Sequence, residues 1–269
     1  MPELPEMETY RKLLEERVGG MVITEARVER EKTINIPPEM FIQTVAGNRL
    51  KHVGRRGKHL LFELESGHAL LLHLMLGGFL YWGSQTDKLE RSAQVTLSPG
   101  PNILYFHGLR LGYLHLLTRD QTAERLADLG PEPLSPVFTL AQFAQLLSKK
   151  KSLLKTALVD QHWLAGIGNC YADEICFHAG ILPTRQIPSL TPEETTRLYH
   201  AIQAILREAM QAGGYMEVPF YHGDRLTGGY NERCRVYDRE GEPCPRCGHR
   251  IAKSMLSSRK VFACTNCQT

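Results

Sequence analysis

The chain has 269 residues, of which 42% are hydrophobic and 23% are charged, and its formal net charge is only +3. This composition excludes an intrinsically disordered, collagen-like or coiled-coil protein, and the length is sufficient for one large domain or two smaller domains with separate cores. The small net charge does not by itself indicate a polyanionic partner.

The basic residues are unevenly distributed along the sequence. Phe41–Phe62 and Pro243–Thr269 contain no acidic residue, although each contains five lysines or arginines. Two such stretches can line one groove that binds a polyanion, whereas each stretch alone also fits an ordinary solvated surface.

No segment is predicted to cross a membrane. The most apolar run, His68–Trp82, is short and is interrupted by His73 and by the pair Gly77-Gly78. The N-terminus has glutamates where a signal peptide has basic and then apolar residues. We therefore expect a cytoplasmic protein whose seven cysteines are reduced thiols or metal ligands rather than disulfides.

Residues 3–18 are predicted to form a helix, because apolar residues recur at helical spacing until the pair Gly19-Gly20. The residues on its apolar face are Met7, Tyr10, Leu14 and Val18. After the helix, short apolar runs alternate with Gly, Ser and Pro, a pattern typical of an antiparallel sandwich or barrel. The strands that we expect are Val22–Val28, His59–Leu64, Ala69–Leu74, Phe79–Trp82, Ala93–Leu97, Ile103–Phe106 and Gly112–Leu117.

The pattern changes at the proline-rich segment Gly130–Pro136, which is typical of an interdomain linker. The helices predicted after it are Thr139–Leu147, Ser152–Val159, Ala172–His178 and Pro192–Ala212. The last of them begins with the capping box Thr191-Pro-Glu-Glu. We therefore expect an α+β protein of several domains: an N-terminal β-sandwich with a leading helix (1–129), a linker (130–138), a helical domain (139–231) and a cysteine-rich hairpin (232–269).

The tail contains two C-x2-C pairs separated by sixteen residues, a spacing that indicates a tetrahedral structural zinc site. The predicted ligands are Cys244, Cys247, Cys264 and Cys267. Four sulfur ligands leave no open coordination position, so we expect one zinc ion with a structural role. Arg259 and Lys260 are expected at the turn of this hairpin, where an arginine can bind a phosphate or can simply be solvated.

Four motifs in this order resemble the formamidopyrimidine-DNA glycosylase and endonuclease VIII family over nearly the whole chain. They are the start Met1-Pro-Glu-Leu-Pro-Glu6, the segment Arg55-Arg-Gly-Lys58, the stretch Asp160–Glu174 with Gly-Ile-Gly-Asn inside it, and the zinc hairpin with Arg259. The resemblance implies a β-sandwich domain, a helix–two-turn–helix domain and a four-cysteine zinc hairpin, with damaged double-stranded DNA in the cleft between the domains. It also implies a monomeric bacterial protein that associates with the nucleoid through DNA.

The resemblance makes Pro2 the nucleophile once Met1 has been removed. An α-amine has a pKa of about 8, so more of it is neutral at neutral pH than of a lysine amine. The resemblance assigns proton transfer to Glu3, a supporting role to Glu6, and phosphate contact and acid catalysis to Lys58. Taken alone, Glu3 also fits a first-turn acid favoured by the helix dipole, Lys58 a strand-edge lysine, and Pro2 an inert N-terminal residue.

In the second half of the chain the resemblance assigns DNA contacts to Lys155 and Asn169, a position near the active site to Glu174, and a catalytic phosphate contact to Arg259. Asn169 lies in a glycine turn at a predicted helix start, which suits a phosphate but also suits ordinary helix capping. Glu174 fits a buried structural carboxylate equally well.

The chain departs from the family in the segments that fill the DNA stack after the damaged nucleotide is extruded. In the family pattern His-Leu-x-Met-x-Gly, Leu76 stands in place of the methionine, unless the neighbouring Met75 substitutes for it. A second family loop reads Asp-Pro-Arg-Arg-Phe-Gly. In this chain Leu109 replaces its first arginine, Arg110 remains as a phosphate contact, and Leu111 replaces its phenylalanine. We therefore expect an apolar wedge and weak discrimination for the base opposite the lesion.

The sequence leads to three hypotheses about function. The first is a DNA-repair glycosylase with AP lyase activity (β,δ-elimination) on oxidised purines or pyrimidines. The second is a lyase that acts on abasic sites or unusual structures, because the lesion-reading residues are altered. The third is a non-catalytic DNA-binding protein, against which Pro2 and Glu3 argue, since binding alone does not need them.

Overall fold

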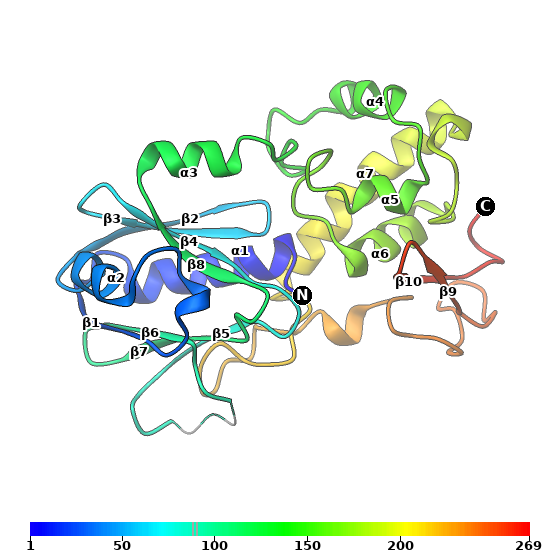
Figure 1. Cartoon of the computed structure of the whole chain (residues 1–269). Helices are drawn as coiled ribbons and strands as arrows, with labels where there is room; N and C mark the ends of the chain where they lie inside the picture. Colours follow the sequence, from blue (N-terminus) through cyan, green and yellow to red (C-terminus); the bar gives the residue numbers. More distant parts are fainter. Residues whose placement is uncertain (88, 90) are drawn as a thin grey trace. The chain divides into compact units, whose positions relative to one another are not determined.

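The computed structural model describes residues 1–87, 89 and 91–269, and these pack as two compact units (Figure 1). The first unit comprises Met1–Asp128 and Ala212–Gly229, and the second comprises Leu129–Gln211 and Tyr230–Thr269. Among the described residues, no helix is both long enough and apolar enough to span a membrane.

The first unit is an antiparallel β-sandwich preceded by a helix, as the sequence predicts. Within the described residues its strands form two four-stranded sheets, ordered β1-β6-β7-β5 and β2-β3-β4-β8. Its elements are α1 (Leu4–Val18), β1 (Ile23–Val28), α2 (Pro38–Val45), β2 (Leu50–Arg56), β3 (His59–Leu64), β4 (Ala69–His73), β5 (Phe79–Gly83), β6 (Val95–Pro99), β7 (Ile103–His107), β8 (Tyr113–Leu117) and α3 (Arg119–Leu126).

Alternate side chains of the two sheets meet in one apolar core. Burial alternates along β3 and β6, so that every second residue enters the core. Phe62 of β3 and Phe106 of β7 meet across the sheets with ring centroids 6.0 Å apart in an edge-on arrangement. The apolar face predicted for α1 is confirmed, because Met7, Tyr10, Leu14 and Val18 are all fully buried in this core.

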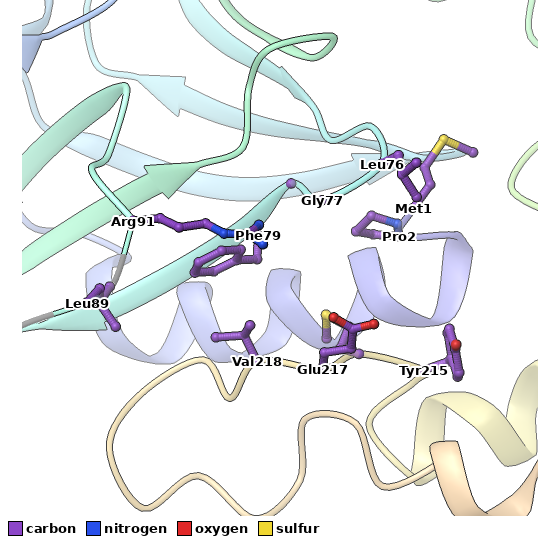
Figure 2. A pocket seen from close by; sticks show the side chains of 12 residues that line it. Met1, Pro2, Leu76, Gly77, Phe79, Leu89, Arg91, Tyr215, Glu217 and Val218 are labelled. Carbon is purple, nitrogen blue, oxygen red and sulfur yellow. The ribbon is translucent and has the colours of Figure 1, made fainter.

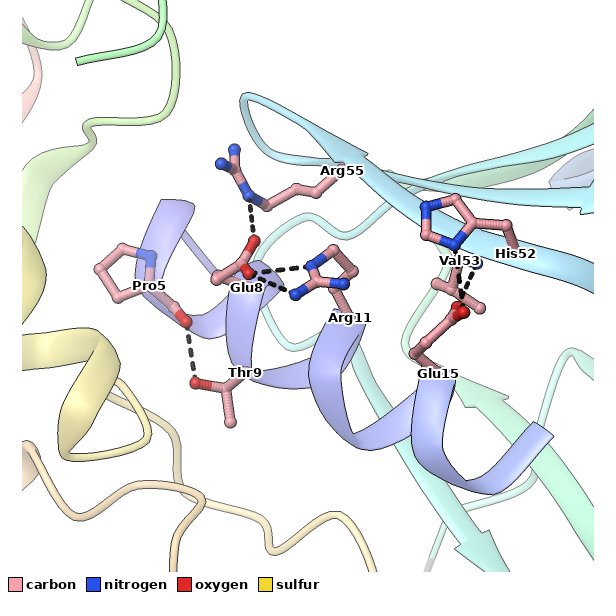
Figure 3. Close-up of polar contacts among 8 residues, drawn as sticks. All are labelled: Pro5, Glu8, Thr9, Arg11, Glu15, His52, Val53 and Arg55. Atoms are coloured by element: carbon pink, nitrogen blue, oxygen red, sulfur yellow. Dashed lines mark hydrogen bonds and ion pairs between the residues drawn. The ribbon is translucent and has the colours of Figure 1, made fainter. Parts of the chain in front are cut away.

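Polar contacts fix α1 against β2 (Figure 3). Arg55 donates to Glu8 over 2.9 Å, and Glu15 accepts from the Val53 backbone N–H over 2.6 Å and contacts His52 Nδ1 at 3.1 Å. Burial opposes ionisation of Glu15, but these two hydrogen bonds outweigh it and lower its pKa. The helix is therefore held in register with the strand that leads to Lys58.

The segment Ala212–Gly229 packs with the sandwich although it follows the helices in sequence. Its Phe220 carbonyl accepts a 2.7 Å hydrogen bond from the Trp82 N–H of β5, and the Phe220 ring lies 5.5 Å from Tyr10. The Arg17 guanidinium lies 4.1 Å from the centre of the Tyr221 ring. This segment therefore brings residues that follow α7 in the sequence beside the N-terminal helix.

The second unit is helical and ends in a β-hairpin, again as predicted. Its elements are α4 (Leu140–Ser148), α5 (Leu154–Leu158), α6 (Asn169–Ala179), α7 (Pro192–Gln211), β9 (Ala252–Leu256) and β10 (Arg259–Ala263). The predicted capping box of α7 is confirmed, because the Glu194 N–H donates to Thr191 Oγ1 and Glu194 Oε2 accepts from the Thr191 N–H. The hairpin packs on α6 through Phe177 and Phe262.

The structure adds β2, α2 and α3 to the predicted elements. Of the seven residues of β2 only Leu50 and Val53 are buried, and α3 buries only Thr122. Such polar segments lack the periodic apolar signal on which a sequence prediction depends. The hairpin turn also differs slightly: Ser257 and Ser258 form it, both with positive φ, and Arg259 is the first residue of β10.

One prediction concerns the histidine pair of the sheet that contains β3 and β4. His59 and His73 stack with ring centroids 4.4 Å apart, and burial, followed by the charge of His73, lowers the pKa of His59 to about 3. The unfolded chain, with a histidine pKa of about 6.5, therefore binds more protons in the interval between these values. We expect the free energy of unfolding to fall as the pH falls from about 6.5 towards 3.

A His59→Phe variant keeps the stacked ring but removes the titrating group. Urea unfolding at several pH values should give a smaller fall for this variant than for the unaltered chain, and contributions from other groups cancel in the comparison. Parallel curves for the two proteins would show that His59 does not carry this pH dependence.

Candidate functional site

The first turn of α1 holds two buried carboxylates next to Pro2. Glu3 is the N-cap residue, and its side chain accepts from the Glu6 N–H, while Glu6 Oε2 accepts from the Glu3 N–H over 2.6 Å. The other oxygen of Glu6 accepts from the Tyr215 N–H over 2.7 Å. Glu3 is 3% exposed and Glu6 is 1% exposed, and Pro2 is buried as well. These hydrogen bonds fix the backbone on which Pro2 and Glu3 are carried.

A cavity of about 480 Å³ opens beside Pro2 within the first unit (Figure 2). Its wall combines the chain start, the β4–β5 connection, the loop before β6 and the segment after α7. The lining residues are Met1, Pro2, Leu76, Gly77, Gly78, Phe79, Leu89, Arg91, Tyr215, Met216, Glu217 and Val218. A volume in the range of about 300–1,000 Å³ suits a small organic group, so this cavity can receive one next to the Pro2 nitrogen.

Lys58 lies in the turn between β2 and β3. The residue is 4% exposed, and its carbonyl oxygen lies 3.3 Å from His73 Nδ1. Burial lowers the pKa of His73, and the charge of Lys58 lowers it further. The imidazole beside Lys58 is therefore neutral at neutral pH.

Two of the three leucines of the predicted apolar wedge, Leu76 and Leu111, stand on adjoining loops. Leu76 is 76% exposed and Leu111 is 70% exposed. Gly108 has φ +69°, and a Cβ built on it would lie only 2.0 Å from the Gly77 carbonyl oxygen. The absence of a side chain at position 108 therefore lets the backbones of the two loops that carry Leu76 and Leu111 touch.

Leu109 differs from the sequence expectation. Its side chain is 1% exposed and belongs to the apolar core, and its N–H donates to Gln94 Oε1 over 3.0 Å. A leucine at this position gains more from the core than from water. Only Arg110 and Leu111 of this loop are presented to solvent.

In the second unit, the glycine turn ends at the start of α6 with Gly168 as N-cap and Asn169 as first helical residue. Gln161 stabilises this turn, because its oxygen accepts from the Gly166 N–H and its NH₂ donates to the Ile167 carbonyl. The buried Oδ1 of Asn169 has no hydrogen-bond partner among the described residues. The N–H groups of a helix start suit an anion, and the NH₂ of the Asn169 side chain, unlike its Oδ1, can donate to one. The sequence reasoning missed Gln161, although it stands inside the same motif.

Lys155 is not available to a phosphate in this structure. Its residue is 1% exposed, and its Nζ lies 2.7 Å from both oxygens of Asp173 and donates to the Lys260 carbonyl. Asp173 also accepts from the Phe262 N–H over 3.0 Å. This buried ion pair joins α5 and α6 to β10, and breaking such a pair typically costs about 3–5 kcal/mol.

Glu174 is likewise part of the scaffold. It is fully buried, and its oxygens accept from the backbone N–H groups of residues 235–237 over 2.9–3.0 Å. Burial raises its pKa, although the three N–H groups oppose that effect. Of the two roles open for Glu174 in the sequence, the contacts favour the structural one.

The four cysteines of the hairpin converge as zinc ligands do. Their sulfur atoms all lie within 4.8 Å of one another, with 3.8 Å between Cys244 and Cys267 and 3.6 Å between Cys247 and Cys264. Zn–S bonds of about 2.3 Å in a tetrahedron place the sulfurs about 3.8 Å apart, so the cluster fits zinc closely. The other three cysteines, Cys170, Cys176 and Cys234, are buried, as expected for core residues.

Arg259 follows the hairpin turn and is exposed. Its neighbour Lys260 is the residue whose carbonyl accepts from Lys155, so the ion pair with Asp173 fixes the backbone beside Arg259. The zinc cluster and this ion pair together hold the arginine on a rigid support.

Family models match most of the chain. Residues 1–114 match the formamidopyrimidine-DNA glycosylase N-terminal domain, residues 129–218 the formamidopyrimidine-DNA glycosylase H2TH domain, and residues 241–269 the zinc finger found in FPG and IleRS. The last match and the cysteine geometry confirm the prediction of one structural zinc.

Relatives that match this chain over its whole length are named formamidopyrimidine-DNA glycosylases. The formamidopyrimidine-DNA glycosylase of Pelotomaculum thermopropionicum is 38% identical, with 100% of this chain and 99% of the relative covered. That of Geobacillus kaustophilus is 36% identical, with both chains covered completely. A solved complex of Lactococcus lactis Fpg with DNA containing an abasic site superposes with a TM-score of 0.92 at 29% identity, covering 99% of each chain. A complex of the same protein with DNA containing N7-benzyl-Fapy-dG gives a TM-score of 0.92 at 29% identity and covers both chains completely.

The zinc site leads to a prediction. We expect one zinc per chain in freshly purified protein, and a Cys264→Ser variant should contain far less metal and lose the hairpin fold, since so small a hairpin has little core. Elemental analysis measures the metal, and protease cleavage within residues 241–269 reports the unfolding. Cys170→Ala is the matched control, a buried cysteine outside the cluster, and should keep its zinc. Equal zinc contents in the two variants would contradict the assignment.

Proposed function

The chain belongs to the formamidopyrimidine-DNA glycosylase family, and from this premise we propose that it excises damaged bases from double-stranded DNA and then cleaves the abasic site. The nucleophile is the amine of Pro2 after removal of Met1. One observation carries the proposal: Pro2 lines a cavity that can receive a base, and the buried carboxylate of Glu3 follows it directly in the chain.

The chemistry follows from a secondary α-amine. The Pro2 nitrogen attacks C1′ of the deoxyribose, the bond from C1′ to the base breaks, and the base leaves with a proton. Opening of the sugar ring gives an iminium ion between the nitrogen and C1′, and O4′ takes a proton from Glu3. The iminium withdraws electrons, so that loss of a C2′ proton expels the 3′ phosphate and a second elimination expels the 5′ phosphate.

The Glu6 carboxylate supports this reaction indirectly. It binds the Glu3 N–H and the Tyr215 N–H, so it fixes both the chain start and the loop that lines the cavity. Removal of Met1 is essential, because an amide nitrogen has no lone pair available for attack.

Phosphate contacts are assigned to Lys58, Arg110, Asn169 and Arg259. Arg110 and Arg259 carry exposed guanidinium groups. Asn169 lies at a helix start, which suits a phosphate of the DNA backbone. Lys58 is assigned by its motif and its turn, and there it also serves as an acid during elimination. Lys155 and Glu174 support these residues through the scaffold and do not bind DNA themselves.

The opposite-base preference should be weak. Leu76 and Leu111 form the apolar pair that fills the vacated stack, and Leu109, where the family has an arginine, is in the core. No guanidinium at position 109 can therefore read the orphaned base. Oxidised purines and oxidised pyrimidines both remain substrates of the proposed enzyme.

The test is covalent trapping with sodium borohydride on duplexes that contain an abasic site. The chain should form a covalent complex, and Pro2→Gly, which retains a less constrained primary amine, should give a greatly reduced yield. Lys12→Met, a change on the same helix away from its first turn, is the control and should trap as the unaltered chain does.

Base release on duplexes with oxidised, alkylated or abasic nucleotides distinguishes the alternatives. A trapped complex without base release would favour the abasic-site lyase. Absence of any trapped complex would contradict the catalytic proposal and favour a DNA-binding protein.

A further inference from the structure

An aromatic side chain on β5 forms part of the cavity wall beside Pro2. Phe79 is paired directly with His107 of β7 across the sheet, and the two rings stack with centroids 4.6 Å apart and planes 11° apart. His107 is 1% exposed, so one face of the Phe79 ring is covered by it. Phe79 also lines the cavity, as Figure 2 shows, so its ring offers a supported aromatic surface to an occupant.

His107 provides this support without a charge. Burial lowers its pKa, and the nearby positive charge of Arg91 lowers it further. A neutral imidazole that is stacked and enclosed behaves as a flat, rigid backing for Phe79.

Arg91 reaches the cavity from the loop between β5 and β6. A Cβ built on Gly77 would lie 3.8 Å from Arg91 Nη1, so the guanidinium occupies the space towards which a side chain at position 77 would point. Figure 2 shows Arg91 extended towards Phe79. A guanidinium has donors and no acceptor, so it pairs with carbonyl oxygens or with other acceptors of an occupant.

Glu217 supplies the opposite chemistry from the segment after α7. It is exposed and lines the same cavity (Figure 2). An ionised carboxylate only accepts hydrogen bonds, so it suits ring N–H or amino groups. The cavity thus combines an aromatic surface, a set of donors and an acceptor within one unit of the protein.

We propose that Phe79 and Arg91 are specificity residues that select the extruded base: Phe79 stacks on it, and Arg91 binds its carbonyl oxygens. This inference rests on the proposed function. The favoured bases are planar and carry carbonyl oxygens next to N–H groups, as oxidised purines and formamidopyrimidines do. Saturated, puckered bases such as dihydrothymine stack poorly and are disfavoured.

The test compares Phe79→Leu and Arg91→Met with the unaltered chain in single-turnover base release. Loss of base–aromatic stacking, worth about 1–3 kcal/mol, corresponds to about a 5- to 150-fold slower release of 8-oxoguanine. Release of dihydrothymine by Phe79→Leu should change by less than about twofold, because little stacking is lost. Arg91→Lys should recover part of the rate on 8-oxoguanine lost in Arg91→Met, since it restores donors.

Two controls and a binding measurement complete this experiment. Cleavage of a pre-formed abasic site has no base to read and should be unchanged in both variants. Arg27→Met alters an arginine on β1, outside the cavity, and should match the unaltered chain on every substrate. Affinity is measured by fluorescence anisotropy, and affinity for an 8-oxoguanine duplex should fall in both variants, while affinity for a tetrahydrofuran abasic analogue should not.

The outcomes separate this inference from the proposed function. Equal base release and equal affinity in Phe79→Leu, Arg91→Met and the unaltered chain, with abasic cleavage intact, would overturn the inference. Failure of the unaltered chain to cleave abasic DNA would overturn the proposed function, and the affinity measurements, which need no cleavage, would still decide whether Phe79 and Arg91 read the base.

Discussion

The arrangement of the residues around Pro2 and the adjoining cavity depends on one buried carboxylate. Glu6 accepts the Glu3 N–H with one oxygen and the Tyr215 N–H with the other, over 2.6 and 2.7 Å. Taking a carboxylate out of water is costly unless hydrogen bonds replace its hydration, and two short, charge-assisted bonds do so here. The same group therefore caps the start of α1, fixes the backbone that follows Pro2 and brings the segment after α7 to the cavity.

The second unit uses buried charge in a comparable way. Lys155 and Asp173 hold the backbone of β10, and Glu174 holds residues 235–237. Lys155 and Glu174, whose motif positions suggest DNA contacts, thus support the elements that carry Asn169 and Arg259. The zinc cluster completes this support at the far end of the hairpin, where the chain is too short to form a large core.

Local signals in the sequence predicted much of this. The apolar face of α1, the Thr191 capping box and the two cysteine pairs each depend on residues close in sequence, and each is confirmed. The chemistry assigned to Pro2 and Glu3 came from the resemblance and remains a proposal, since a lone N-terminal proline has no local signature of reactivity.

Long-range packing could not be predicted from one sequence. Glu6 and Tyr215 are 209 positions apart, and Lys155 and Lys260 are 105 apart. Burial of Leu109 beside exposed Leu111 depends on how Gly108 packs against Gly77, which no periodicity encodes. The Phe79–His107 stack likewise arises only when β5 and β7 pair in their actual register.

The identity of the nucleophile is tested by locating the covalent bond in the complex reduced by borohydride. After digestion of the DNA and of the protein, mass spectrometry of the N-terminal peptide should show a chain that begins at Pro2 and carries the sugar remnant on the Pro2 nitrogen. A remnant on a lysine, or a reactive chain that still begins with Met1, would show that the N-terminal proline is not the nucleophile.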